Sequence, residues 1–130
     1  MCIRDRWLSA HQAHGALVAR WTRTPVDLVI AVGPIFSAVE RSALHDQLPP
    51  GSAVHWVVLD APVTTTLARA AVDPTRGRSR DAAFHRERYE RFRRLLPDIP
   101  AAQSFDTDVT GAPTIALEVL AAVVLSLIHI

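Results

Sequence analysis

The stretch VHWVVLDAPVTTTLARAAVDPTRGRSRD, residues Val54–Asp81, carries three structural signals in succession. Val54–Leu59 is an apolar run, which predicts a strand buried on both faces. Pro62 then falls at the first position of an expected helix, where its missing N–H removes no helical hydrogen bond. Asp73 and Pro74 end that helix and lead into a loop. A strand followed by a helix predicts one unit of a parallel α/β sheet.

The loop carries three arginines, Arg76, Arg78 and Arg80, and a helix with further arginines follows it. Guanidinium groups present forked donors that match pairs of phosphate oxygens, and they stay charged when water is excluded. The loop is therefore predicted to close over a polyphosphate. A solvated connection between two helices is the alternative interpretation of the same charges.

Composition limits the classes of function. The chain has 130 residues, 49% of them hydrophobic and 21% charged, which is typical of one folded domain. Its net charge of +1 argues against a surface built throughout for nucleic acid. All 14 basic residues are arginine, so no mechanism that needs a lysine ammonium is possible. The single cysteine, Cys2, excludes an internal disulfide and a zinc site with several cysteines.

The two ends look foreign to the domain. MCIRDR, residues 1–6, and SLIHI, residues 126–130, resemble translated sequencing adapters, so we expect a non-native leader, a domain over residues 7–125 and a non-native tail. The apolar run Val119–Ile128 is only about ten residues long, too short to span a bilayer. A cytoplasmic protein is the expectation.

The remaining segments extend the α/β pattern. Ser37 and Glu40 have the spacing of a capping box, which predicts a helix start. Asp81 is expected to cap the arginine-rich helix. The predicted elements are helices over residues 7–23, 37–48, 62–72, 81–96 and 113–125, and strands over 27–36, 54–59 and 104–107. This order predicts a three-layer parallel sheet covered by helices.

The order of these segments resembles a known family. The motifs VHWVVLDAP, LAR, DPTRGRSRD, HRERYERF and FDTD follow one another as in the C-terminal two-thirds of small P-loop kinases. That group includes gluconate kinase-like, zeta-toxin-like and chloramphenicol phosphotransferase-like ATP-binding proteins of the AAA type. The resemblance covers roughly Ser9 to Val124 and depends most on the DPTRGRSRD loop.

The resemblance implies a role for each matching segment. The lid would be Thr75–Arg80, in which Arg76 and Arg80 contact the β- and γ-phosphates and offset charge in the transition state. The rest of the nucleotide would meet the cofactor-binding residues Arg69, Arg78, Asp106 and Thr107. The acceptor, a small molecule with a hydroxyl group, would face Gly33, Pro34 and Ile35. ATP and Mg²⁺ would serve the parent protein, and no metal ligand is assigned in this chain.

The departures from the family are as informative as the matches. No G-x-x-x-x-G-K-[ST] loop is present. Ala31 and Val32 stand where relatives often carry a carboxylate. We therefore expect a fragment that neither binds ATP tightly nor transfers phosphate. In such kinases the P-loop strand lies between the strands that correspond to 27–32 and 54–59. Its loss would leave unpaired backbone groups that cost about 1–3 kcal/mol each, so a marginally stable or aggregation-prone chain is predicted.

Several features have simpler explanations. The arginines of residues 86–94 are explained by a solvated helix face, with Glu87 and Glu90 as local partners. Contact with nucleic-acid phosphates is an alternative for this helix, and a degenerate, partner-binding scaffold is a third class of function. His11 and His14 have the spacing to present two imidazoles on one helix face, but without a third ligand partial burial or surface exposure is favoured over metal binding. Asp60 and Asp106 fit either a site or a turn cap.

Overall fold

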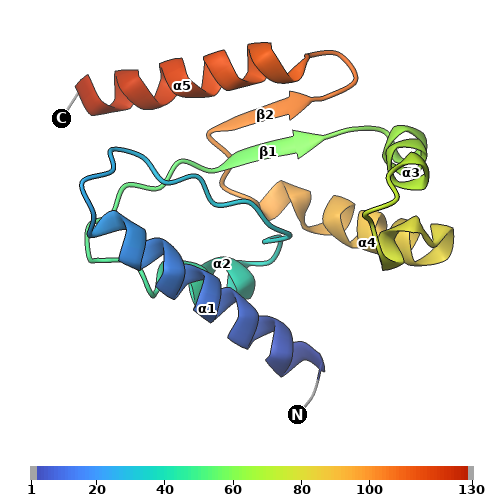
Figure 1. Cartoon of the computed structure of the whole chain (residues 1–130), viewed down its shortest axis with the longest axis horizontal. Helices are drawn as coiled ribbons and strands as arrows, with labels where there is room; N and C mark the ends of the chain where they lie inside the picture. Colours follow the sequence, from blue (N-terminus) through green and yellow to red (C-terminus); the bar gives the residue numbers. More distant parts are fainter. Residues whose placement is uncertain (1–2, 129–130) are drawn as a thin grey trace. The chain divides into compact units, whose positions relative to one another are not determined.

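The computed structural model describes residues 3–128 of the chain. Its elements are α1 (Ile3–Thr22), α2 (Ala38–His45), β1 (Val57–Asp60), α3 (Val63–Val72), a 3₁₀ turn η1 (Arg78–Arg80), α4 (Ala82–Leu95), a 3₁₀ turn η2 (Leu96–Asp98), β2 (Gln103–Asp106) and α5 (Ala112–Ile128) (Figure 1). The chain is a mixed α/β protein, as the sequence predicted, but helices dominate it. Its sheet in the described residues has two parallel strands, and the three-layer arrangement stays a prediction.

The chain divides into two compact units. The first contains residues 1–53 and 95–99, and the second contains residues 54–94 and 100–130. Helix α1 begins within the segment predicted as a leader, and α5 continues into the segment predicted as a tail. None of the helices in residues 3–128 combines the length and the apolar character needed to cross a bilayer.

The first unit is built on close contact between α1 and α2. His11 and Glu40 are both buried, and His11 Nε2 lies 3.1 Å from Glu40 Oε2. The capping box predicted from the sequence is confirmed, because the Glu40 amide donates to Ser37 Oγ and the Ser37 amide donates to Glu40 Oε1. Glu40 therefore starts α2 and also joins it to α1. This explains why His11 packs inside the unit.

Gly15 permits the close approach of the two helices. A Cβ atom at this position would collide with the Leu44 carbonyl oxygen and lie 2.9 Å from Leu44 Cα, both of them backbone atoms. Gly15→Ala is expected to lower the free energy of unfolding by about 1–3 kcal/mol, although alanine favours helix by roughly 1 kcal/mol. Urea denaturation measures this. Gly33→Ala is the control, because its Cβ would meet no atom closer than 3.8 Å. Equal midpoints for both variants would contradict the packing argument.

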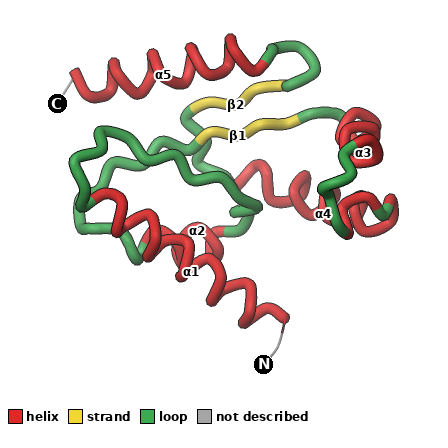
Figure 2. Tube along the Cα trace, in the orientation of Figure 1, coloured by secondary structure: helices red, strands yellow, loops and turns green. Residues whose placement is uncertain are grey.

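The strand predicted over Asp27–Phe36 is wrong. This segment is coil in the first unit (Figure 2). Within the described part of the chain, no backbone group of residues 26–32 has a backbone partner. Ile30 and Val32 are 76% and 84% exposed. An apolar run forms a strand only beside another strand, because the backbone N–H and C=O groups of a strand pair with those of its neighbour.

The second unit is organised around a short parallel pair. β1 and β2 lie side by side in the register Val57↔Gln103 through Asp60↔Asp106 (Figure 1). In the described residues β2 is the only strand bonded to β1, so the other edge of β1 carries no strand. Helices α3 and α4 form the connection between the two strands.

The core is thin. The buried apolar residues are small or few: Ala19, Leu44, Val58, Ala61, Ala70 and Ile115. Among the described residues no large side chain is less than 2% exposed. Because burial of apolar surface is the main favourable contribution to folding, this core favours the prediction of marginal stability, which stays a prediction.

Candidate functional site

The parallel pairing brings two carboxylates to one edge of the sheet. Asp60 and Asp106 are opposite each other in the register, at the carboxyl ends of β1 and β2. The Thr107 amide donates to the Asp60 carbonyl oxygen at 2.8 Å, which extends the pairing by one residue. In open α/β sheets the carboxyl edge is where ligands bind, so the side chains gathered there form the candidate site.

Asp60 is fixed by two contacts. Its Oδ1 accepts from the Ala61 amide at 2.8 Å, and its Oδ2 accepts from Arg93 Nη1 at 2.7 Å. The ion pair is partly exposed, with 22% of the Asp60 side chain and 48% of the Arg93 side chain accessible. An exposed pair of this kind contributes at most about 1 kcal/mol. Its main effect is to orient the carboxylate.

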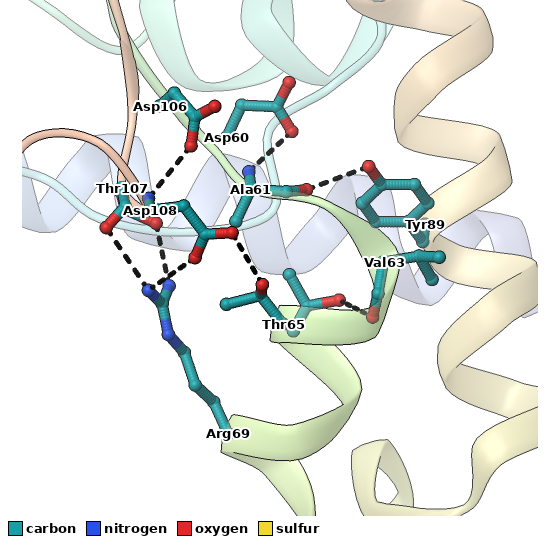
Figure 3. Close-up of polar contacts among 10 residues, drawn as sticks. Asp60, Ala61, Val63, Thr65, Arg69, Tyr89, Asp106, Thr107 and Asp108 are labelled. Carbon is teal, nitrogen blue, oxygen red and sulfur yellow. Dashed lines mark hydrogen bonds and ion pairs between the residues drawn. The ribbon is translucent and has the colours of Figure 1, made fainter.

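Arg93 belongs to a polar stripe that the sequence analysis missed. His85, Tyr89 and Arg93 are four residues apart on α4, so they share one helix face. The Tyr89 hydroxyl donates to the Ala61 carbonyl oxygen at 2.8 Å (Figure 3). The stripe attaches α4 to the end of β1, to Ala61 and to α3. The four-residue spacing is visible in the sequence. It was missed because every arginine of residues 86–94 was assigned to a solvated helix face.

Arg69 holds the loop that follows β2. Its Nη1 donates to Thr107 Oγ1 at 2.7 Å and its Nη2 donates to the Thr107 carbonyl oxygen at 3.3 Å. Nη2 also lies 3.5 Å from Asp108 Oδ1, while Asp108 Oδ2 accepts from the Thr65 hydroxyl at 2.7 Å (Figure 3). The guanidinium and α3 together fix the position of Thr107. Sequence reasoning had not assigned a role to Thr65 or Asp108.

Asp106 caps the turn after β2. Its Oδ1 accepts from the Asp108 amide at 2.9 Å, and its carbonyl oxygen accepts from Val109 and Thr110. Three of the predicted nucleotide-binding residues, Arg69, Asp106 and Thr107, therefore lie in one connected network. The side chain of Asp106 supports the turn, which was the alternative interpretation of this residue.

The predicted lid begins with a local network at Asp73. Its Oδ1 accepts from the Thr75 amide at 2.9 Å and from the Thr75 hydroxyl at 2.6 Å. Its Oδ2 lies 3.4 Å from Arg76 Nε. The network orients Arg76 toward the start of the loop. Arg76 would exchange this exposed partner for a phosphate at little expense, because such surface pairs are weak.

Arg78 and Arg80 form the tip of the arginine loop, which we define as residues 76–80. The Arg78 guanidinium carbon lies 4.5 Å from the centre of the Phe84 ring, a cation–π distance. Arg80 is exposed on η1. Within residues 3–128 neither guanidinium is paired with a carboxylate. Both cations are therefore open to an external anion.

The hydrogen bond from the Thr75 hydroxyl is the largest cause that lowers the pKa of Asp73 from its ordinary 3.8, followed by the Thr75 amide and Arg76. A lowered folded-state pKa means that the carboxylate stabilises the loop above its ordinary pKa. This contribution is lost as pH falls through the lowered value. Thr75→Val is therefore expected to raise the Asp73 pKa toward 3.8. An NMR titration of the carboxyl carbon measures it, with Thr64→Val as the control; an unchanged pKa in Thr75→Val would contradict the assignment.

The three residues expected to face the acceptor belong to the first unit. Gly33 to Ile35 form a tight turn in which the Ile35 amide donates to the Gly33 carbonyl oxygen at 2.9 Å. They follow the coil segment rather than a strand. The sequence argument placed Gly33, Pro34 and Ile35 at the carboxyl end of a strand, and that part of the argument is wrong.

Among the described residues, no group of three or more histidine, cysteine, aspartate or glutamate side chains has the arrangement to hold a metal ion. The second unit offers two separate groups of polar side chains, the cations at the tip of the arginine loop and the network at the carboxyl edge of the sheet. Comparison of the chain with protein-family models, with curated proteins and with solved structures finds no match.

Proposed function

We propose that the chain is the lid-bearing part of an ATP-dependent small-molecule kinase of the P-loop type. The parent protein, a cytoplasmic enzyme, transfers the γ-phosphoryl group of ATP-Mg²⁺ to a hydroxyl group. The arginine loop closes over the phosphates, and the Asp106–Thr107 turn lies near the base. The chain alone is inactive, because it contains neither a glycine-rich loop nor any lysine.

The observation that carries this proposal is a pair of cations at the loop tip that no carboxylate of the described residues neutralises. Arg78 and Arg80 follow a parallel strand–helix unit and have no carboxylate partner in the described residues. The loop concentrates three arginines, Arg76, Arg78 and Arg80, within five residues. Phosphate oxygens are the anions that forked guanidinium donors match best.

The open edge of β1 supports the same proposal. Kinases of this group place the strand of the P-loop beside the strand that corresponds to β1, and β1 bonds to a strand on one side alone in the described residues. The resemblance therefore accounts for the open edge of β1.

The gene tests the proposal. Reading the coding DNA upstream of the Trp7 codon is expected to reveal an open frame that encodes a glycine-rich loop ending in Gly-Lys-Ser or Gly-Lys-Thr. The longer protein should then release ADP when it is given ATP, Mg²⁺ and a panel of hydroxyl compounds. A stop codon in that frame followed by a start at Met1 would contradict the proposal and favour a partner-binding scaffold.

A nucleic-acid-binding module is the second candidate, and the exposed arginines of α4 favour it. Arg86 and Arg94 are exposed, but the helix also uses Arg93 internally for Asp60. Filter binding of a labelled oligonucleotide at low and moderate salt separates the two functions. Binding that falls steeply with salt supports the module, and no retention at low salt removes it.

A further inference from the structure

His85 contacts both the arginine loop and α3, the helix that precedes it. Its Nδ1 lies 3.0 Å from the carbonyl oxygen of Ser79, in the middle of the loop. Its Nε2 lies 2.9 Å from the hydroxyl oxygen of Thr66 on α3. The imidazole is partly buried, so it is held among these groups rather than projecting into water. A single side chain of α4 thus joins the loop to α3.

The polarity of these hydrogen bonds places a proton on Nδ1 of the ring. A carbonyl oxygen only accepts, so Nδ1 must carry a proton and donate to Ser79. In the neutral ring Nε2 then accepts from the Thr66 hydroxyl. In the imidazolium Nε2 donates instead, and Thr66 turns its proton to the Val63 carbonyl oxygen, which lies 2.9 Å from its Oγ1. The ring keeps both partners in either state.

The other contacts of the loop tip are local or come from the residue next to His85. The Arg80 amide donates to Gly77, and the Asp81 amide donates to Arg78, which shapes η1 without attaching it. Arg78 stacks on Phe84. Adjacent residues of α4 therefore hold adjacent residues of the loop. Phe84 contacts the side chain of Arg78, and the His85 ring contacts the backbone of Ser79.

We propose that His85, supported by Thr66, is a positioning residue that latches the arginine loop in the conformation that presents Arg78 and Arg80. The inference rests on the proposed function, in which the loop binds phosphate. A loop that is already ordered loses less conformational freedom when it binds an anion. It concerns a residue that does not itself touch the phosphates. The latch acts through the Ser79 carbonyl oxygen.

Native-state trypsin digestion measures the latch directly, because the loop contains three arginyl bonds. In His85→Ala, cleavage after Arg76, Arg78 and Arg80 is expected to accelerate by about 2- to 10-fold, the factor that corresponds to one lost hydrogen bond. Cleavage after Arg69 on α3 reports unfolding of the whole unit and should not change. An unchanged rate in the loop would overturn the proposal.

Two conservative variants sharpen the test. An asparagine amide stands in for Nδ1, so His85→Asn is expected to restore most of the protection, whereas His85→Gln, whose amide stands in for Nε2, is not. Thr66→Val keeps the shape of the threonine, removes its hydroxyl and should accelerate loop cleavage. If faster cleavage after Arg69 shows that His85→Ala unfolds the unit, the comparison of His85→Asn with His85→Gln becomes the test of the latch. Equal loop cleavage in His85→Asn and His85→Gln overturns the latch.

Added inorganic tripolyphosphate separates this inference from the function on which it rests. If the ligand slows loop cleavage in the unmodified chain, the proposed function is supported. If it gives no protection while His85→Ala still loosens the loop, the phosphate role fails and the latch stands. If tripolyphosphate protects the unmodified chain, but the loop of His85→Ala is cleaved no faster than that of the unmodified chain without ligand, the latch is overturned and the proposed function stands.

Discussion

Alanine at both Arg78 and Arg80 is expected to weaken the binding of inorganic tripolyphosphate about 10- to 100-fold. Each guanidinium would supply a charge-assisted hydrogen bond, and about 1.4 kcal/mol corresponds to a tenfold change in affinity. Both side chains are without a carboxylate partner in the described residues, so their removal disturbs no internal ion pair. The dissociation constant at low ionic strength, followed by phosphorus NMR, measures the effect.

A matched variant makes this result specific. Arg86 and Arg94 are exposed on α4, and their replacement by alanine changes the net charge by the same amount. We expect this control to change the dissociation constant less than about threefold, because it alters only the long-range field, which salt screens. Equal losses in the two double variants would assign the binding to general charge and would contradict a phosphate-specific loop.

Alanine at His11 is expected to lower the free energy of unfolding by about 3 kcal/mol. The imidazole is a buried partner of the Glu40 carboxyl group, and the two side chains are only 6% and 10% exposed. Loss of the imidazole removes this buried hydrogen bond and leaves a cavity beside a buried carboxyl group. Because the core is thin, this loss is a large share of the total free energy of unfolding. Urea denaturation followed by tryptophan fluorescence measures it.

The double variant His11→Leu with Glu40→Gln distinguishes a lost polar contact from lost packing. Glutamine keeps the capping box with Ser37, and leucine fills part of the space of the imidazole. Replacement of both members of a buried polar pair is often close to neutral in stability, so most of the loss should be recovered. A double variant as unstable as His11→Ala would contradict the polar-contact explanation.

Local signals in the sequence were sufficient for most helices and for two strands. The Ser37–Glu40 capping box starts α2 as predicted, and the Asp81 carboxylate accepts from the Phe84 amide at the start of α4. Pro62 precedes α3 by one residue rather than opening it. These devices act over three or four residues, so the sequence shows both partners at once.

Features that depend on distant partners were harder to predict. The run at Asp27–Phe36 has strand composition, but a strand requires a neighbour, and composition does not reveal whether one is present. The contacts of Arg69 with Thr107 and of His85 with Thr66 join residues 38 and 19 positions apart. Arg93 was assigned to water because Glu87 and Glu90 offered nearby partners, whereas its partner is Asp60 at the end of β1.

The most direct measurement of the central claim, that the arginine loop binds polyphosphate, is an amide NMR map of the chain titrated with tripolyphosphate at low salt. The account predicts that the largest shift changes fall on Gly77 to Asp81, with smaller changes at Phe84 and His85. Changes that are centred on Arg86 and Arg94, or that are absent from the loop at saturating ligand, would contradict it.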